Sequence, residues 1–85
     1  MHVLTVLDHP NPASFSAAVA EQFKQGTQDA GHSTELADLN AEGFDPRWSM
    51  ADIESDGNGN VPADVLTEQA RIARADAICF VFPLF

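Results

Sequence analysis

Three short stretches of the chain have the hydrophobic pattern of β-strands. Residues 3–7 are aliphatic or β-branched and run into turn-forming residues. Residues 77–82 are apolar without alternation, which is typical of a strand covered on both faces in a parallel sheet. Residues 33–39 include Glu35 and Asp38, so we expect this strand to lie at the edge of the sheet.

One long stretch has the pattern of an amphipathic helix. In residues 14–30, apolar or small side chains recur every three or four positions and so share one helix face. They are Phe15, Ala18, Val19, Phe23, Gly26 and Ala30. Ser14 suits an N-cap, although Asn11 with Pro12 at the first helical position would also serve, and Gly31 suits a left-handed C-cap.

The stretch between the second and third strands is more varied. Residues 40–46 read as a loop, and residues 49–52 as one or two helical turns. Residues 55–60, SDGNGN, have the composition of a surface turn. A second helix is predicted over residues 62–74, with an apolar side made of Val65, Leu66, Ala70, Ile72 and Ala73.

The predicted order is strand, helix, strand, short helix, helix, strand. Strands that alternate with helices indicate an α/β fold with a parallel sheet. The strand at residues 77–82 would keep an open apolar edge, since residues 83–85 provide neither a helix nor a further strand. We therefore expect residues 1–85 to be the amino-terminal part of a single domain, and the isolated chain to be oligomeric or poorly soluble.

Charge narrows the classes of partner. The 85 residues include 4 Lys and Arg against 13 Asp and Glu, a formal net charge of -9. Nucleic acids and anionic membranes attract Lys and Arg, so neither is an expected partner. No apolar stretch reaches the roughly 20 residues of a membrane-spanning helix. Residues 1–10 lack the features of a secretory signal, and we expect a cytoplasmic protein without membrane insertion.

The residues that commonly bind metals are few and scattered. Cys79 is the single cysteine, so an internal disulfide and a cysteine-rich metal site are excluded. His2, His9 and His32 fall on separate predicted elements and show no ligand spacing with a carboxylate. No metal site is expected.

Two segments are expected at the ligand-binding edge of the sheet, because ligands of open α/β sheets bind outside the carboxyl ends of the strands. Residues 9–16 lead into a helix N-terminus, where free amides and the hydroxyls of Ser14 and Ser16 suit a phosphate. Residues 83–85 follow the third strand. In a sheet of order 2-1-3 the first and third strands are neighbours, so both segments would flank one crevice.

Along nearly its whole length the chain resembles the NAD(P)H:quinone oxidoreductase family. The resemblance rests on DHPNPASFS at residues 8–16, AGH at 30–32, DL at 38–39, GFDP at 43–46, EQ at 68–69, AD at 75–76 and FPL at 82–84. It implies a flavodoxin-like doubly wound parallel sheet with strands 2-1-3 present and the later strands absent. It also implies that bound FAD or FMN takes hydride from NADH or NADPH and passes it to a quinone, in a protein that is a homodimer at full length.

Carried over by position, the resemblance assigns two groups of flavin contacts. The phosphate and ribityl part would lie against His9, Ser14, Phe15 and Ser16, and the isoalloxazine along Pro83, Leu84 and Phe85. The family commonly has Asn in place of Ser16, and Trp or Gln in place of Phe85. Its nicotinamide and quinone pocket uses Tyr and His residues after Phe85, and this chain has no Tyr. No catalytic acid or base is expected, because the flavin carries the hydride.

Simpler roles and another class of function are also open. Ser14 and Ser16 are typical helix caps, Phe15 and Phe82 are typical core residues, and Cys79 is a typical inert small hydrophobe. Relatives of the family include flavin-bearing ancillary subunits of potassium-efflux systems. A non-catalytic flavin-binding or regulatory module, or an inactive remnant, is therefore the alternative to an enzyme, and we expect the chain alone to bind flavin weakly.

Overall fold

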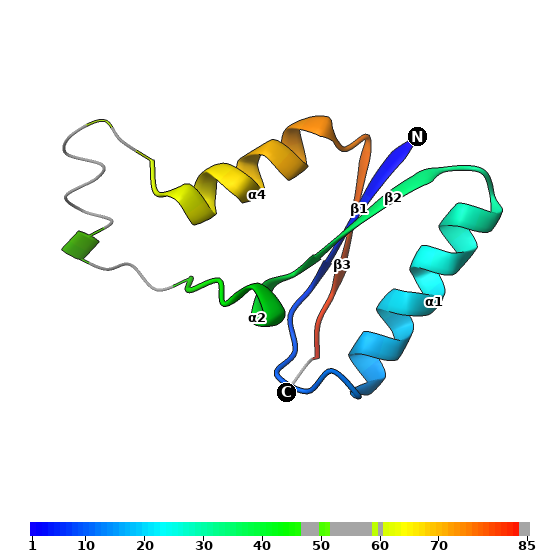
Figure 1. The fold of residues 1–85 in the computed structure, drawn as a ribbon. Coiled ribbons are helices and arrows are strands. Elements are labelled where there is room, and N and C mark those ends of the chain that lie inside the picture. The colour runs from blue at the N-terminus through cyan, green and yellow to red at the C-terminus, as the bar shows by residue number, and fades with distance from the viewer. Residues whose placement is uncertain (47–49, 52–58, 60, 84–85) are drawn as a thin grey trace.

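Three parallel strands form the centre of the molecule (Figure 1), in a computed structural model that describes residues 1–46, 50, 51, 59 and 61–83. β1 (His2–Leu7) lies between β2 (Ser33–Asp38) and β3 (Ala77–Val81), which gives the order β2-β1-β3. Leu7, at the carboxyl end of β1, is level with Asp38 on one side and Val81 on the other. The predicted strands, their parallel pairing and their order are confirmed, each boundary within one residue.

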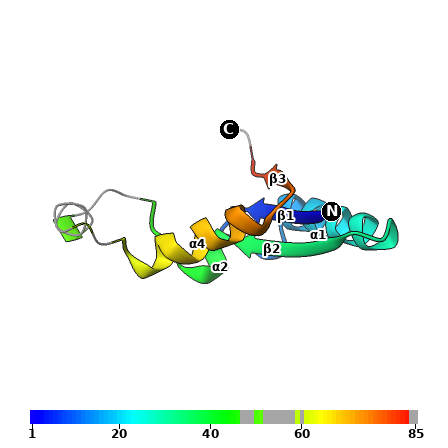
Figure 2. The same ribbon diagram turned by 90° about the horizontal axis from the view of Figure 1, so that it is seen from above.

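Helices lie on both sides of the sheet. α1 (Phe15–Asp29) lies on one side of the strands, and α2 (Leu39–Glu42) and α4 (Ala63–Arg74) lie on the other (Figure 1). Seen from above, α1 lies at one end of the molecule and the segment 50–51 at the other, with the sheet between them (Figure 2). None of the described helices is long and apolar enough to cross a bilayer.

The boundaries of α1 follow from its capping residues. The Ser14 side chain accepts a hydrogen bond from the Ala17 N–H at 3.0 Å, so Ser14 is the N-cap. The alternative start at Asn11 is wrong, because the Asn11 side chain instead accepts from the Ala13 N–H and closes a turn before the helix. Gly31 follows the helix with φ of 87°, the left-handed conformation expected there.

The segment after β2 differs in part from the prediction. Residues 40–46 are not all loop, since α2 occupies the first of them. The Asp38 side chain caps this helix by accepting from the Ala41 N–H at 3.1 Å, and Gly43 ends it in the left-handed conformation. Met50 and Ala51 are helical as predicted, and the rest of residues 49–52 lies outside the described residues, as does most of residues 55–60. α4 begins after Pro62, which confirms the second predicted helix.

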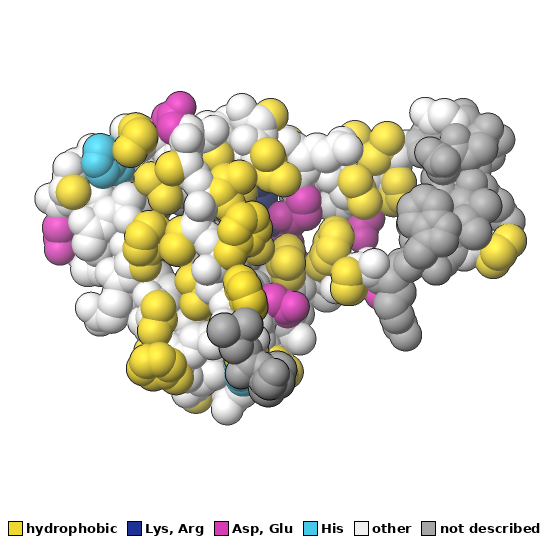
Figure 3. Space-filling view, turned by 180° about the vertical axis from the view of Figure 1, so that it is seen from behind, with side chains coloured by type: hydrophobic (Ala, Val, Ile, Leu, Met, Phe, Trp, Pro, Cys, Tyr) yellow, Lys and Arg dark blue, Asp and Glu magenta, His cyan; other side chains and the backbone are white. Residues whose placement is uncertain are grey.

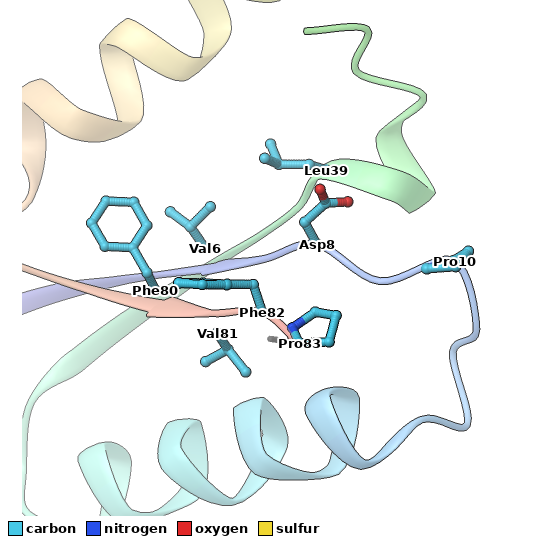
Figure 4. Close-up of a pocket in the computed structure, with 8 residues that line it drawn as sticks. All are labelled: Val6, Asp8, Pro10, Leu39, Phe80, Val81, Phe82 and Pro83. Atoms are coloured by element: carbon cyan, nitrogen blue, oxygen red, sulfur yellow. The ribbon is translucent and has the colours of Figure 1, made fainter. Parts of the chain in front are cut away.

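The buried core is small and is divided between the two faces of the sheet, since Leu4 and Ala37 share the strand face of Val6, which projects away from α1 (Figure 4). Its members are Val3, Leu4, Thr5, Leu7, Ala20 and Ala37. Ala20 is the buried residue of α1, whereas Phe15, Val19 and Phe23 on the predicted apolar face are exposed. The predicted face is therefore wrong, because the buried and half-buried residues of α1 are Ser16, Ala17, Ala20, Lys24 and Thr27.

Two further expectations about the core are also wrong. Phe15 is 84% exposed and Phe82 is 58% exposed, so neither is a core residue. β3 was expected to be covered on both faces, but its Ile78 and Phe80 side chains are exposed. Hydrophobic side chains accordingly gather on the side of the molecule where β3 lies, which is the side seen in Figure 3.

Candidate functional site

The loop after β1 and the segment after β3 meet at the carboxyl edge of the sheet. They meet because β1 and β3 are neighbours in register up to Leu7 and Val81. The pairing continues one residue further, since the Asp8 N–H donates to the Val81 carbonyl oxygen at 3.2 Å. The structure therefore places His9 and Pro83, at the start of the two predicted site segments, at the same edge.

The loop between β1 and α1 is held by hydrogen bonds around Asn11. The Asn11 N–H donates to Nδ1 of His9 at 3.0 Å, and the Ser14 N–H donates to the Asn11 carbonyl oxygen at 3.1 Å. Because Nδ1 of His9 accepts this bond, a neutral imidazole carries its proton on Nε2. His9 can then donate from Nε2 to a ligand without disturbing the loop.

The N-terminus of α1 provides the donors of this site. Ser14 satisfies two amides of the first turn, because its side chain accepts from Ala17 and its carbonyl oxygen accepts from Ala18 at 3.1 Å. The N–H groups of Phe15 and Ser16 are the first two of the helix, so they have no intrahelical acceptor. The role of Ser14 as a cap is confirmed, and its hydroxyl proton is still available. This end of the helix suits an anion.

A hollow of about 500 Å³ lies at the ends of β1 and β3, and we call it the strand-end hollow (Figure 4). Its lining residues are Val6, Asp8, Pro10, Leu39, Phe80, Val81, Phe82 and Pro83. Val6, Leu39 and Phe80 project on the side of the sheet away from α1, and Val81 projects towards α1 (Figure 4). The lining is apolar apart from Asp8, and both its volume and its character suit part of a flat aromatic ligand.

A second hollow of about 370 Å³ lies beside the first turn of α1. It is lined by Leu7, Pro12, Ala13, Ser14, Ala17, Ala18, Glu21, Leu36 and Asp38. The carboxylates of Glu21 and Asp38 disfavour a phosphate inside it. An anion is therefore better placed at the helix end, against the amides of Phe15 and Ser16.

The predicted site residues are brought together only in part. Pro83 lines the strand-end hollow and Ser14 lines the second hollow. His9 and Ser16 are half-buried in the loop and the first turn, whereas the Phe15 side chain projects into solvent. Leu84 and Phe85 lie outside the described residues.

Several lining residues were missed from the sequence. Asp8 directly follows β1 and Leu39 directly follows β2, and the carboxyl ends of parallel strands lie at one edge. That rule is the signal from which both could have been found. Phe82 was missed for a different reason, because its aromatic side chain suggested a core position.

A cluster of charged side chains attaches α4 to the opposite side of the sheet, and we call it the α4 ion cluster. It consists of His2, Glu35, Glu42, Glu68, Arg71 and Arg74. Arg74 donates Nε to Oε2 of Glu35 at 2.9 Å and pairs with Oε1 through Nη2. Hydrogen bonding to Arg74, followed by that to His2, lowers the pKa of Glu35 to about 2 against the opposing effect of desolvation.

Arg71 joins two carboxylates within the same cluster. Its Nη1 pairs with Oε1 of Glu42 and donates to Oε1 of Glu68 at 2.7 Å. Desolvation raises the pKa of Glu68, and hydrogen bonding to the adjacent Glu42 raises it further. The hydrogen bond to Glu42 raises the pKa of the Arg71 guanidinium. Among the described residues, no group of His, Cys, Asp and Glu side chains is arranged to hold a metal ion.

Comparisons with known proteins agree with this architecture. The profile of a family described as having a flavodoxin-like fold matches residues 1–85. A solved structure named NAD(P)H:quinone oxidoreductase, from Methanothermobacter marburgensis, is 38% identical and matches with a TM-score of 0.86. The match covers 100% of this chain and 45% of that chain.

Two curated relatives extend the comparison. A Haemophilus influenzae protein named as an uncharacterized NAD(P)H oxidoreductase is 34% identical over 86 residues, which cover 100% of this chain and 43% of the relative. The NAD(P)H dehydrogenase (quinone) 1 of Cavia porcellus is 32% identical over 98 residues, which cover 95% of this chain and 36% of the relative. The chain therefore spans less than half the length of these relatives.

Proposed function

The chain belongs to the family with a flavodoxin-like fold, and we propose that it supplies the phosphate-binding part of a flavin site in an NAD(P)H:quinone oxidoreductase. The observation that carries this function is the free end of α1, together with the β1–α1 loop, which leads into this helix and lines the strand-end hollow through Asp8 and Pro10. An anion-binding helix end next to an apolar hollow matches the two ends of a flavin nucleotide. The printed names of the relatives support the reaction class.

Each residue has a separate task in binding. The backbone N–H groups of Phe15 and Ser16, the Ser14 hydroxyl and Nε2 of His9 would donate to the phosphate and ribityl part of FAD or FMN. Nothing here requires the Phe15 side chain, which is exposed. The Ser14 cap would keep the first turn formed while its hydroxyl proton turns to the ligand.

The isoalloxazine would lie along Pro83, Leu84 and Phe85, beside the strand-end hollow. Pro83 lines that hollow, and Leu84 and Phe85 are assigned from the family resemblance alone. When bound, the flavin accepts hydride from NADH or NADPH and passes it to a quinone. The chain's own residues bind and orient it and carry no proton transfer. We place the full protein in the cytoplasm as a homodimer.

Flavin titration of the 85-residue chain tests this function. FMN or FAD fluorescence is followed as protein is added, for the wild type and for Ser16→Asp and Gln22→Glu. Both substitutions add one negative charge to α1, but only Ser16→Asp places it at the helix end. We expect Ser16→Asp to weaken flavin binding at least tenfold and Gln22→Glu to leave it unchanged.

Other results of this titration would refute the site or favour a non-catalytic protein. Wild-type binding that Ser16→Asp does not weaken, or no binding at all, would refute the proposed site. Oxidation of NADH or NADPH with a quinone, by the flavin-loaded protein, separates the enzyme from the module. Flavin binding without turnover would favour the non-catalytic flavin-binding module.

A further inference from the structure

A hollow of about 480 Å³ lies beside α2, and we call it the α2 hollow. Its apolar lining consists of Leu39, Phe44 and Pro46, and its polar lining of Asp8, Asn40 and Asp45. It shares Asp8 and Leu39 with the strand-end hollow, so the two hollows adjoin at the carboxyl ends of β1 and β2. None of the described residues assigned to the flavin lines the α2 hollow, so it is free to bind a different ligand.

The wall that α2 contributes to this hollow is closed by backbone hydrogen bonds. The Gly43 N–H donates to the Asn40 carbonyl oxygen at 3.1 Å, and the Phe44 N–H donates to the Leu39 carbonyl oxygen at 3.0 Å. The two bonds form the usual helix end around a left-handed glycine, and they bring Phe44 back to Leu39. Phe44 and Leu39 are both half-buried. The apolar wall is therefore formed before any ligand binds.

Asp8 places a carboxylate where the two hollows adjoin. Its backbone is held in the sheet, because its N–H donates to the Val81 carbonyl oxygen at 3.2 Å. Its carboxylate points towards Leu39 (Figure 4). In the part of the chain that the structure describes, this carboxylate has no hydrogen bond and no ion pair. A cation in the α2 hollow could pair with Asp8 without displacing another partner.

The charges around the α2 hollow favour a positive ligand. Among the described residues no Lys or Arg lines it, since Lys24 lies on α1 and Arg71 and Arg74 belong to the α4 ion cluster. Asp8 and Asp45 give the hollow a negative potential, and the net charge of -9 adds to it. Anionic ligands are disfavoured for the same reason.

The rest of the lining restricts the kind of cation. A metal ion does not fit, because among the residues described no group of His, Cys, Asp and Glu is arranged to hold one. A small ammonium ion would leave the apolar wall of Leu39, Phe44 and Pro46 uncovered. A planar ring would cover this wall, and a positive charge on the ring is attracted both by an aromatic side chain and by a carboxylate.

We propose that the α2 hollow binds an aromatic cation, which is a planar nitrogen heterocycle that carries a positive charge. Asp8 is its counter-ion, and Phe44 and Leu39 form the surface against which the ring packs. A volume of about 480 Å³ is sufficient for one such ring with its substituents. This binding requires no flavin, so its test is independent of the flavin titration.

Three pyridines of similar size but different charge test the proposal. At neutral pH 1-methylnicotinamide is positive, nicotinamide is neutral and nicotinate is negative. Each is titrated into the isotope-labelled 85-residue chain, and the NMR shifts of the Asn40, Gly43 and Phe44 amides give the Kd. Asp8→Asn is compared with Asp29→Asn, because both remove one negative charge from an exposed position and Asp29 lies at the far end of α1.

We expect 1-methylnicotinamide to bind about tenfold more tightly than nicotinate, with nicotinamide between them. Asp8→Asn should weaken the binding of 1-methylnicotinamide and leave that of nicotinamide unchanged, whereas Asp29→Asn should change neither. Phe44→Leu keeps an apolar wall without the ring and should also weaken 1-methylnicotinamide. Circular dichroism checks that each variant is folded, and the three ligands on the wild type give a result that needs no variant.

Several results would overturn the proposal. Equal affinities for the three pyridines would exclude selection by charge, and equal effects of Asp8→Asn and Asp29→Asn would exclude Asp8 as the counter-ion. Tetramethylammonium that binds as tightly as 1-methylnicotinamide would show that the ring is not recognised. The absence of shifts at Asn40, Gly43 and Phe44 would show that the α2 hollow binds none of these ligands.

Discussion

Arg74 of α4 donates two hydrogen bonds to the carboxylate of Glu35 on β2, from Nε and from Nη2. Such bidentate pairs have a fixed geometry. None of the 12 residues of α4, all of them described, is fully buried. The helix is therefore attached to the sheet mainly through the α4 ion cluster, and removing Glu35 should affect α4 first.

We expect Glu35→Gln to lower the free energy of unfolding by about 1 kcal/mol, which is about 4–8 °C in Tm for a small domain. The substitution removes the negative charge of the carboxylate that Arg74, Arg71 and His2 share, although the amide keeps one acceptor oxygen. Urea and thermal unfolding followed by circular dichroism measure the change. Glu21→Gln, in an exposed position on α1, is the control. Equal losses in the two variants would show that Glu35 has no special role.

Acid should destabilise the wild type through the same residue. The pKa of Glu35 is lowered from 4.5 to about 2, so the unfolded chain takes up its proton at higher pH than the folded chain does. This contribution is fully present above about pH 4.5 and is lost as the pH falls towards 2. Urea unfolding across this range should show a steeper loss for the wild type than for Glu35→Gln. Parallel pH profiles would contradict the assignment.

Glu68 should make the stability of the protein depend on pH in the opposite direction to Glu35. Its pKa is raised in the folded state, so its contribution is present below its unfolded pKa and is lost as the pH rises through the folded value. Glu68→Gln keeps a carbonyl oxygen for Arg71 and removes the charge beside Glu42. The stability of this variant relative to the wild type should therefore increase from acidic to neutral pH. A relative stability that falls over this range would be the contrary result.

Two substitutions at Ser14 should separate capping from anion binding. Ser14→Ala removes the acceptor of the Ala17 N–H and should lower the free energy of unfolding by about 1 kcal/mol. Ser14→Asp keeps an acceptor, so unfolding should change little, but its charge should repel a flavin phosphate. Urea unfolding and FMN titration of both variants give the comparison. Equal FMN affinity of Ser14→Asp and the wild type would exclude a phosphate at this end of α1.

Leu4 and Phe15 should differ sharply despite their similar size. Leu4 is 1% exposed, and Leu4→Ala should cost about 2–5 kcal/mol, enough to unfold a domain with so small a core. Phe15 is 84% exposed, and Phe15→Ala should change stability by about 0.5 kcal/mol or less. Thermal unfolding of the two variants measures both. A large destabilisation by Phe15→Ala would mean that its side chain is packed in solution.

The three strands follow from local patterns in the sequence, and these patterns also restrict the start of α1 to Ser14 or Asn11, whereas the order of the sheet was implied by the family resemblance. Glycine, turn formers and hydroxyl caps act within a few residues, so their effects can be predicted without tertiary structure. The packed face of α1 could not be predicted in this way. Periodicity groups Phe15, Val19 and Phe23 on one face, but the geometry of the sheet selects the smaller Ala20.

The candidate site, like the fold, could be predicted only in part. The juxtaposition of the β1–α1 loop with the end of β3 follows from strand order alone. The α4 ion cluster could not be found, because Glu35, Arg71 and Arg74 are far apart in the chain and their pairing depends on where α4 lies. Expectations for Leu84 and Phe85 remain predictions.

Ala20 has a consequence for the way that the proposed flavin site tolerates change. It is the buried residue of α1 at 2% exposed, so a single methyl group sets the spacing between this helix and the sheet. A larger side chain there would push α1 outward and carry the amides of Phe15 and Ser16 with it. The position of these amides is thus set by a residue of the second helical turn, which contacts no ligand in the proposed site. Sequence drift at Ala20 would then be filtered by flavin binding as strictly as drift within the β1–α1 loop.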